Sequence, residues 1–287
     1  MIFTKKMAKL KIGIIGGSGF YNMPELTNIK TEHIETEFGS PSDNLVSGFI
    51  EGLPCVLLSR HGKDHKYNPT EVNYRANIHA MRKLGVTHIL AATACGSLKE
   101  ELPPGHFVIL DSFIDRTTKR ISTFHDQNSS SSFGTVCHIP MHPAFCKETS
   151  NVLAQAAEEV LGNNKKLWSS TGTVVTIEGP RFSTKAESLL FKSWNCDVIN
   201  MTTVPEVVLA KEAGISYAAV AMVTDYDCWR GKDEAVNVET VMEQMKENVK
   251  VVTKLFAHTI QLMARNNKTW DDIIETNNEV AKNSIIH

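Results

Sequence analysis

Residues 198–223 read VINMTTVPEVVLAKEAGISYAAVAMV, which is an apolar run of strand length, a helical segment and a second apolar run. The runs Val198–Met201 and Tyr217–Val223 lack polar alternation, which is typical of strands buried on both faces of a parallel sheet. The segment between them, Val204–Ala213, predicts a helix. Strand, helix and strand in this order indicate an α/β fold.

The same alternation continues on both sides of this segment. Further apolar runs occur at Lys11–Ile15, Leu53–Leu58, Ile89–Ala94, Phe107–Leu110 and Thr173–Ile177. Further helices are predicted at Glu71–Leu84, Pro143–Leu161, Thr184–Trp194 and Val238–Met263. We therefore expect one domain over residues 10–265, with a central mixed, mostly parallel β-sheet flanked by helices. Residues 266–287 are expected to form a tail or a short helix that packs near the active site.

Three helix starts carry recognisable capping chemistry. Asn68-Pro69-Thr70-Glu71 offers an N-cap, a proline for the first helical position and a glutamate. Thr184 with Glu187, and Thr203 with Glu206, both have the spacing of a capping box.

Composition and charge argue against several classes of protein. The net charge is −2 over 287 residues, too small to hold nucleic acid or a membrane surface by charge. No segment approaches the ~20 apolar residues that span a bilayer, and the N-terminus lacks the pattern of a signal peptide. The six cysteines form no CxxC pair, which is typical of reduced thiols. We expect a cytoplasmic protein, with the nucleus as a second compartment.

Two strand exits and the N-terminal glycine-rich turn offer groups for an anion. Ser18 lies in that turn, Arg60 and His61 follow the strand ending at Leu58, and Thr93 and Ala94 end the next predicted strand. Open α/β sheets bind ligands at the carboxyl ends of their strands, and Arg suits phosphate. A tight turn without ligand and a surface ion pair are the alternatives. His61 and His65 share i,i+4 spacing but have no third ligand, so no metal is expected.

Other strand exits offer groups for a purine nucleoside. Thr202 and Thr203 precede a predicted helix, where they either bind an anion or only cap the helix. Phe182 either stacks on a base or sugar or fills the core. Asp227 is able to accept from the N6 amino group of a 6-aminopurine, and a protonated Asp225 to donate to N7. Burial beneath Phe182 would raise the pKa of Asp225; solvated loop acids are the alternative.

At these positions the chain resembles the trimeric purine nucleoside phosphorylase family. The resemblance covers roughly residues 10–260, and its longest block, Asn200–Ile215, is highly specific. The matching segments are GIIGGSG, SRHG, TACGSL, IEGPRFS, NMTTVPEVVLAKEAGI and TDYDCW, in this order.

The resemblance implies roles for named residues. It implies a phosphate site of Ser18, Arg60, His61, Thr93, Ala94 and Thr202. It implies substrate contacts from Phe182, Met201, Asp225, Asp227, His65, Val241 and Met242, with Ser183 and Val238 as specificity positions. It also implies a homotrimer in which His138 reaches the active site of the neighbouring subunit.

The function implied is phosphorolysis of a 6-aminopurine nucleoside, with 5′-methylthioadenosine as the substrate, inorganic phosphate as the co-substrate and no cofactor. Asp225 is the expected catalytic acid. Val238, Val241 and Met242, at i, i+3 and i+4 of a helix, are expected to receive the methylthio group. Three alternatives remain: a phosphorylase of inosine or guanosine, a hydrolase that uses water, and a non-catalytic nucleoside sensor.

Overall fold

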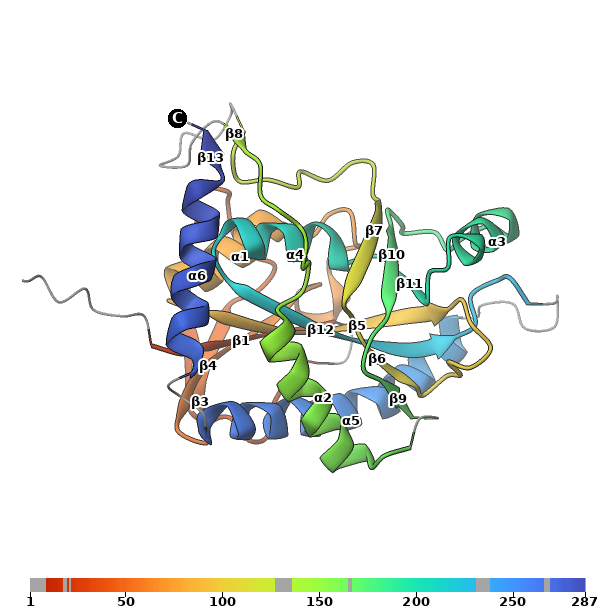
Figure 1. Cartoon of the computed structure of the whole chain (residues 1–287), viewed down its shortest axis with the longest axis horizontal. Helices are drawn as coiled ribbons and strands as arrows, with labels where there is room; N and C mark the ends of the chain where they lie inside the picture. Colours follow the sequence, from red (N-terminus) through yellow and green to blue (C-terminus); the bar gives the residue numbers. More distant parts are fainter. Residues whose placement is uncertain are drawn as a thin grey trace, which may run out of the picture.

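A computed structural model describes residues 9–17, 20, 22–126, 136–164, 167–230, 238–265 and 269–286, with the backbone alone for Val238, Thr240 and Thr269. The chain forms one α/β domain in which a large mixed, mostly parallel sheet is flanked by helices (Figure 1). This arrangement confirms the expected fold class. None of the helices described is both long and apolar enough to cross a membrane.

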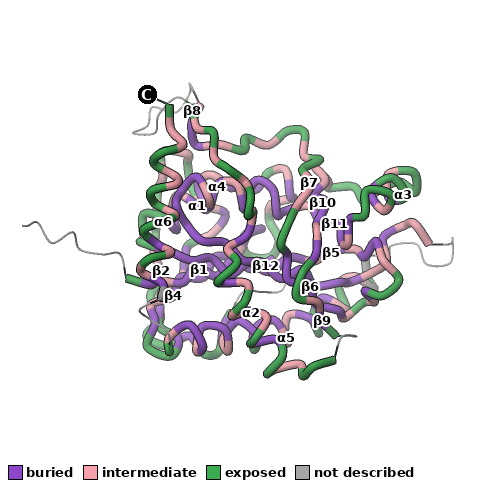
Figure 2. Tube along the Cα trace, viewed as in Figure 1, coloured by how far each residue is buried: buried purple, intermediate pink, exposed green. Residues whose placement is uncertain are grey.

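Four parallel strands form the middle of the sheet. Strand β1 (Ile12–Gly16) lies between β4 (Leu53–Ser59) and β5 (His88–Ser97), and β12 (Ser216–Asp225) pairs with the other edge of β5. Figure 2 shows these central strands buried along most of their length. Burial on both faces explains why their sequences are continuous apolar runs.

A second group of strands leaves a break along one edge of β5. Strands β7 (Ser112–Arg116), β10 (Thr173–Ile177) and β11 (Val198–Asn200) are parallel to one another, and β11 pairs antiparallel with β5 at Gly96 and Ser97. Strand β1 pairs with β5 only as far as Ala91. Residues 92–95 of β5 therefore have no strand beside them on that edge in the described part of the chain, and a ligand can reach their backbone there.

Helices cover both faces of the sheet (Figure 1). On one face α1 (Tyr74–Lys83) and α4 (Thr203–Glu212) pack together over alternate residues of β5 and β12. On the other face α2 (Lys147–Leu161) and α5 (Val238–Arg265) pack over the remaining ones. Helix α3 (Lys185–Ser193) follows β10. The predicted helices are confirmed, apart from their ends.

The C-terminal segment forms the helix α6 (Thr269–Asn283), which packs against α4 and β12. After it, β13 (Ile285–Ile286) pairs antiparallel with β8 (Val136–Cys137). Packing of this segment near an active site stays a prediction.

The seven predicted strands are present, but several others were not predicted. Among the unpredicted strands are β2 (Thr27–Glu32), β3 (Leu45–Ile50) and β9 (Trp168–Ser169), and a 3₁₀ turn lies at Lys63–His65. The predicted run Phe107–Leu110 forms β6 (Phe107–Ile109). Strand β2 is an exposed edge strand, so its sequence TNIKTE has no buried face to mark it.

Of the three predicted helix starts, the one at Thr184 is confirmed and the one at Asn68 is wrong; the third, at Thr203, is described with the site below. Thr184 and Glu187 form the expected capping box at α3. Helix α1 begins at Tyr74 rather than Glu71, because Asn73 provides the cap by accepting from the backbone N–H of Ala76. The Asn68 side chain instead closes a separate turn by accepting from the N–H groups of Thr70 and Glu71.

Candidate functional site

A cavity of about 310 Å³ opens at the break between β1 and β11. Strands β4, β5, β10, β11 and β12 all lead into it through their carboxyl ends, and residues of the first turn of α5 line one side. The predicted residues that line it are Arg60, His61, His65, Thr93, Ala94, Phe182, Ser183, Met201, Thr202, Asp225, Asp227, Val241 and Met242. Residues far apart in the sequence thus share one cavity.

Three predicted residues are not seen in this cavity. His138 is exposed, and its backbone N–H donates to the carbonyl of Ser284. Ser18 lies outside the described residues, and so does the side chain of Val238, whose backbone begins α5. Their predicted contacts stay predictions.

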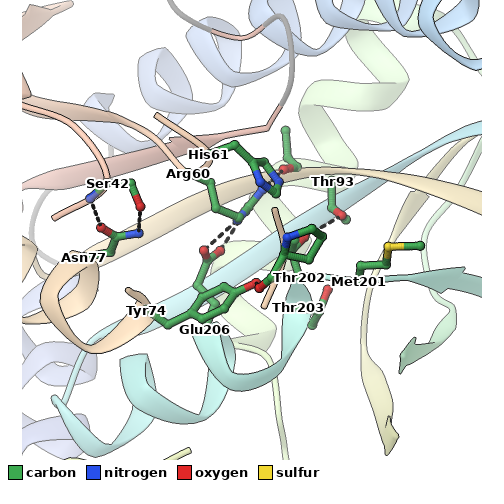
Figure 3. A network of polar contacts seen from close by, with 12 residues as sticks. Ser42, Arg60, His61, Tyr74, Asn77, Thr93, Met201, Thr202, Thr203 and Glu206 are labelled. Carbon is green, nitrogen blue, oxygen red and sulfur yellow. Dashed lines mark hydrogen bonds and ion pairs between the residues drawn. The ribbon is translucent and has the colours of Figure 1, made fainter. Parts of the chain in front are cut away.

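Arg60 anchors one end of the cavity from a buried position (Figure 3). Its Nε and Nη2 donate to the two carboxylate oxygens of Glu206 at 2.7 Å each, and Nη1 donates to the carbonyl of Ala92 at 2.9 Å. Ala92 lies where β5 has lost its neighbour β1, so Arg60 satisfies that carbonyl. A guanidinium has five N–H donors, and these contacts use three, which leaves two for a ligand.

The predicted capping box of Thr203 and Glu206 is wrong. Val204 has extended backbone angles (φ −104°, ψ 132°), and α4 has no side-chain cap. Glu206 is fully buried and receives hydrogen bonds from Arg60 and from the hydroxyl of Tyr217 instead. The buried guanidinium of Arg60 needs a counter-ion. Glu206, 146 residues away in the sequence, provides it, and this ion pair holds the Glu206 side chain in place of a capping hydrogen bond.

His61 is a neutral ring beside this pair. Burial, reinforced by the positive charge of Arg60, lowers the pKa of His61 to about 3. Its Nδ1 lies 2.8 Å from the carbonyl oxygen of Tyr67, which only accepts, so Nδ1 carries the proton and Nε2 is an acceptor. His65 stacks on the ring with centroids 4.3 Å apart.

Hydroxyl groups extend the polar end of the cavity. The Oγ1 atoms of Thr93 and Thr202 lie 3.1 Å apart and are both buried (Figure 3). The hydroxyl of Thr203 is also buried and accepts a hydrogen bond from Asn200. Neither Thr202 nor Thr203 caps α4 with its side chain. Together with Arg60, these groups supply N–H and O–H donors of the kind that bind a tetrahedral oxyanion.

Two carboxyl groups mark the opposite end. Burial raises the pKa of Asp225, although the hydroxyl of Thr224 and the backbone N–H of Asp227 hydrogen-bond to it. Burial also raises the pKa of Asp227, against the nearby hydroxyls of Ser188 and Ser183. A raised pKa means that each carboxyl group keeps its proton to a higher pH than an exposed aspartate does.

The sheet packs closely around Asp225. Phe182 is 42% exposed in the single chain, so it does not fill the core. A Cβ added to Gly96 would lie 3.1 Å from Oδ1 of Asp225, which shows how closely β5 encloses this group. Phe182 is left free to contact a ligand from the open side.

Comparison with known proteins identifies the family. The sequence profile of the phosphorylase superfamily matches residues 11–261, nearly the whole described domain. The chain belongs to the phosphorylase superfamily. This match confirms the resemblance found in the motifs.

Relatives of this superfamily member are similar over their whole length. The S-methyl-5′-thioadenosine phosphorylases of Anopheles gambiae and Danio rerio are 53% and 50% identical to it, covering 98% and 96% of both chains respectively. The methylthioadenosine phosphorylase of Schistosoma mansoni in complex with adenine has a TM-score of 0.89 at 42% identity, covering 96% of this chain and 99% of that one. A variant of the Schistosoma mansoni enzyme has been solved in complex with methylthioadenosine, with a TM-score of 0.88.

Sequence reasoning missed the arginine that supports this phosphorylase-superfamily site. The buried Arg120 donates to the carbonyls of Met201, Val204 and Glu178 and pairs with the Glu178 carboxylate. Arg120 thereby connects the segment at Glu178, before Phe182, to the turn that carries Thr202. Arg120 follows no predicted strand and matches no motif, so the sequence offered no signal for it.

No group of three or more His, Cys, Asp or Glu side chains in the described residues is placed to hold a metal ion. His61 and His65 stack on each other, and Nδ1 of His61 is used by Tyr67.

Proposed function

We propose that this protein catalyses the phosphate-dependent cleavage of 5′-methylthioadenosine to adenine and 5-methylthioribose 1-phosphate, a step of purine and methionine salvage. One observation carries the proposal: a single cavity has donors for an oxyanion at one end and two acids at the other, Asp227 buried and Asp225 half-buried. The relatives at about half identity, named for this activity, support the choice of nucleoside.

Phosphate binds at the Arg60 end. The two remaining N–H groups of Arg60, the hydroxyls of Thr93, Thr202 and Ser18, and the backbone at Ala94 hold its oxygens. The Nε2 atom of His61 accepts a hydrogen bond from a P–OH group. Phosphate held against the anomeric carbon attacks as the base leaves, and its negative charge stabilises the oxocarbenium-like transition state.

The purine binds at the Asp225 end, between Phe182 and Met201. Asp227 accepts from the N6 amino group, and protonated Asp225 donates to N7 as negative charge develops on the leaving base. A carboxylate opposite the O6 atom of inosine or guanosine would be repelled, which disfavours 6-oxopurine substrates. Ser183, beside Asp227, contributes to this choice.

The methylthio group binds against Val238, Val241 and Met242 at the start of α5, and His65 lines the same cavity. Burying this group is worth ~1–3 kcal/mol. Because valine cannot hydrogen-bond a 5′-hydroxyl, we expect Val238→His to shift the kcat/KM ratio from methylthioadenosine towards adenosine. An unchanged ratio would remove the assignment of Val238.

The functional unit is a homotrimer in the cytoplasm, with the nucleus as a second compartment. His138, exposed and outside the cavity of its own chain, completes the active site of the neighbouring subunit. All six cysteines are free thiols, which suits a reducing compartment. The enzyme needs no cofactor beyond phosphate as co-substrate.

The direct test is adenine release from methylthioadenosine with and without inorganic phosphate, with inosine as the control nucleoside. We expect release only with phosphate and little turnover of inosine. Release without phosphate would identify a hydrolase, preferred turnover of inosine a different phosphorylase, and binding without turnover a nucleoside sensor. Each of these outcomes would overturn the proposal.

A further inference from the structure

The side chain of Asn200, at the end of β11, connects hydroxyl groups from three neighbouring segments. Its Nδ2 donates to Oγ1 of Thr93 at 3.0 Å and to Oγ1 of Thr203 at 2.7 Å. Its Oδ1 accepts from the hydroxyl of Thr176, the partner of Asn200 in β10, at 2.9 Å. All four side chains are buried, so water does not compete for these contacts.

The hydrogen bonds fix which way the amide points. In this orientation both Nδ2 hydrogens have acceptors, and the proton of Thr176 has Oδ1. The reversed amide would face Thr176 with its NH₂ group. It would then leave the proton of Thr176 and one N–H without an acceptor among the described residues, which is costly in a buried position.

The fixed amide dictates the direction of the Thr93 proton. Because Oγ1 of Thr93 accepts from Asn200, its own proton must point elsewhere, and the acceptors in reach are the Ala94 carbonyl at 3.2 Å and Oγ1 of Thr202 at 3.1 Å. If Thr93 donates to Thr202, the proton of Thr202 is free to point into the cavity. Bound phosphate then meets the Thr202 hydroxyl as a donor, and the Thr93 proton, which the Asn200 NH₂ group cannot accept, is available to Thr202 or to a phosphate oxygen.

We propose that Asn200 is a positioning residue: by donating to Thr93 it keeps the Thr93 and Thr202 hydroxyl protons available to the phosphate of the proposed reaction. The proposal deepens the proposed function and rests on its assignment of the phosphate site. Asn200 acts by donating to Thr93, so an isosteric residue that only accepts reverses the effect. An ionised carboxylate at this position draws the protons of Thr93 and Thr203 to itself and turns a lone pair of Thr93 towards the anion.

The test is the variant Asn200→Asp. Calorimetry measures the Kd of inorganic phosphate for the whole chain, in the variant and in the unaltered protein, from about pH 5.5 to about pH 8.5. We expect the ratio of phosphate Kd values, variant over unaltered protein, to reach ~10–100 at the alkaline end. The ratio should shrink as pH falls and the new carboxyl gains a proton, because its O–H is again a donor. Methylthioadenosine KM should change much less than phosphate Kd.

Asn77→Asp is the matched control. Asn77 is also fully buried, but it exchanges hydrogen bonds with Ser42 away from the cavity, so its phosphate Kd should stay unchanged at every pH (Figure 3). If Asn200→Asp does not fold, Thr176→Val removes the anchoring donor with little change of shape and should weaken phosphate binding ~3–10-fold. The proposal is overturned by a Kd ratio near one in the folded variant, by a ratio that does not depend on pH, or by undetectable phosphate binding in the unaltered protein. Turnover assays test the proposed function separately, because the calorimetric comparison needs no nucleoside.

Discussion

At the residue scale, the neighbours of Asp225 can accommodate its proton. The single hydroxyl proton of Thr224 has two acceptors in reach, the Cys95 carbonyl at 3.1 Å and Oδ2 of Asp225 at 2.7 Å. Without a bound purine, a protonated Asp225 satisfies both, because its O–H donates to Thr224 while Thr224 donates to Cys95. When the nucleoside binds, this one proton turns from Thr224 to N7. Burial also raises the pKa of this carboxyl, which favours the same protonated form.

Removing this acid should reduce catalysis more than binding. We expect Asp225→Ala to lower kcat ~10²–10⁴-fold, because the variant no longer stabilises the charge on the leaving adenine. Phosphate Kd should stay within about twofold, since Asp225 lies at the other end of the cavity. Steady-state kinetics with both substrates checks this, and a kcat within about threefold of the unaltered enzyme would refute the assigned role.

The pH profile gives a second test at the same residue. The reaction uses the protonated form, so kcat should fall as pH rises through the raised pKa of Asp225. Asp225→Asn keeps a donor that does not titrate in this range. Its kcat should be lower but should lack the alkaline decline. A decline that persists unchanged in this variant would assign the titration to another group.

At the element scale, Arg120 fixes the segment at Glu178 relative to the turn between Met201 and Val204. Because the Arg120–Glu178 pair is largely buried, Arg120→Met should lower the free energy of unfolding by ~3–5 kcal/mol. Arg120→Lys keeps the charge but loses the planar fork, so it should raise nucleoside KM with a smaller loss of stability. Arg75→Lys is the control, because its pair with Asp126 is more exposed and should contribute at most ~1 kcal/mol. Equal stability losses at Arg75 and Arg120 would contradict this role.

His88 connects β5 to α6 and should make folding sensitive to acid. It is fully buried against Trp270, with ring centroids 5.1 Å apart, and burial lowers its pKa to about 3. The unfolded chain takes up a proton near pH ~6.5 while the folded chain does not. The stability associated with this neutral ring is therefore complete above that pH and is lost progressively as pH falls towards 3.

Replacing this ring should flatten the acid dependence. Between pH 7 and pH 5 we expect His88→Phe to lose less unfolding free energy than the unaltered protein, by about 2 kcal/mol. Urea unfolding at several pH values measures the difference, and the exposed His33→Phe serves as the control. Identical pH slopes for His88→Phe and the unaltered protein would show that His88 does not carry the effect.

Elements that are buried on both faces were predictable, and those that depend on distant partners were not. The apolar runs of β1, β5 and β12 identify strands from their own residues. Strand β2 is exposed and is held by pairing with β3, so its sequence alone carries no such signal. Glu206 shows the same limit within a site, because local spacing suggests a cap while Arg60 decides its position.

At the scale of the whole molecule, sheet topology decides where the site lies. Strand β1 leaves β5 at Ala91 and β11 joins it at Gly96, so the chain segments after five strands converge on one opening. This explains why residues at separate strand exits, each a weak signal in the sequence, line one cavity. The opening is incomplete on the side of α5, where Met242 is 44% exposed in the single chain.

A neighbouring subunit that supplies His138 would complete that side, and subunit mixing tests this. We expect His138→Ala to lower kcat/KM for methylthioadenosine ~10-fold by removing one polar contact. Asp225→Ala and His138→Ala chains, unfolded together in equal amounts and refolded, should form trimers in which about a quarter of sites have both residues intact. Adenine release should then exceed the mean of the two variants refolded alone. If His138 acts within its own chain, every site lacks one residue and the mixture shows only that mean.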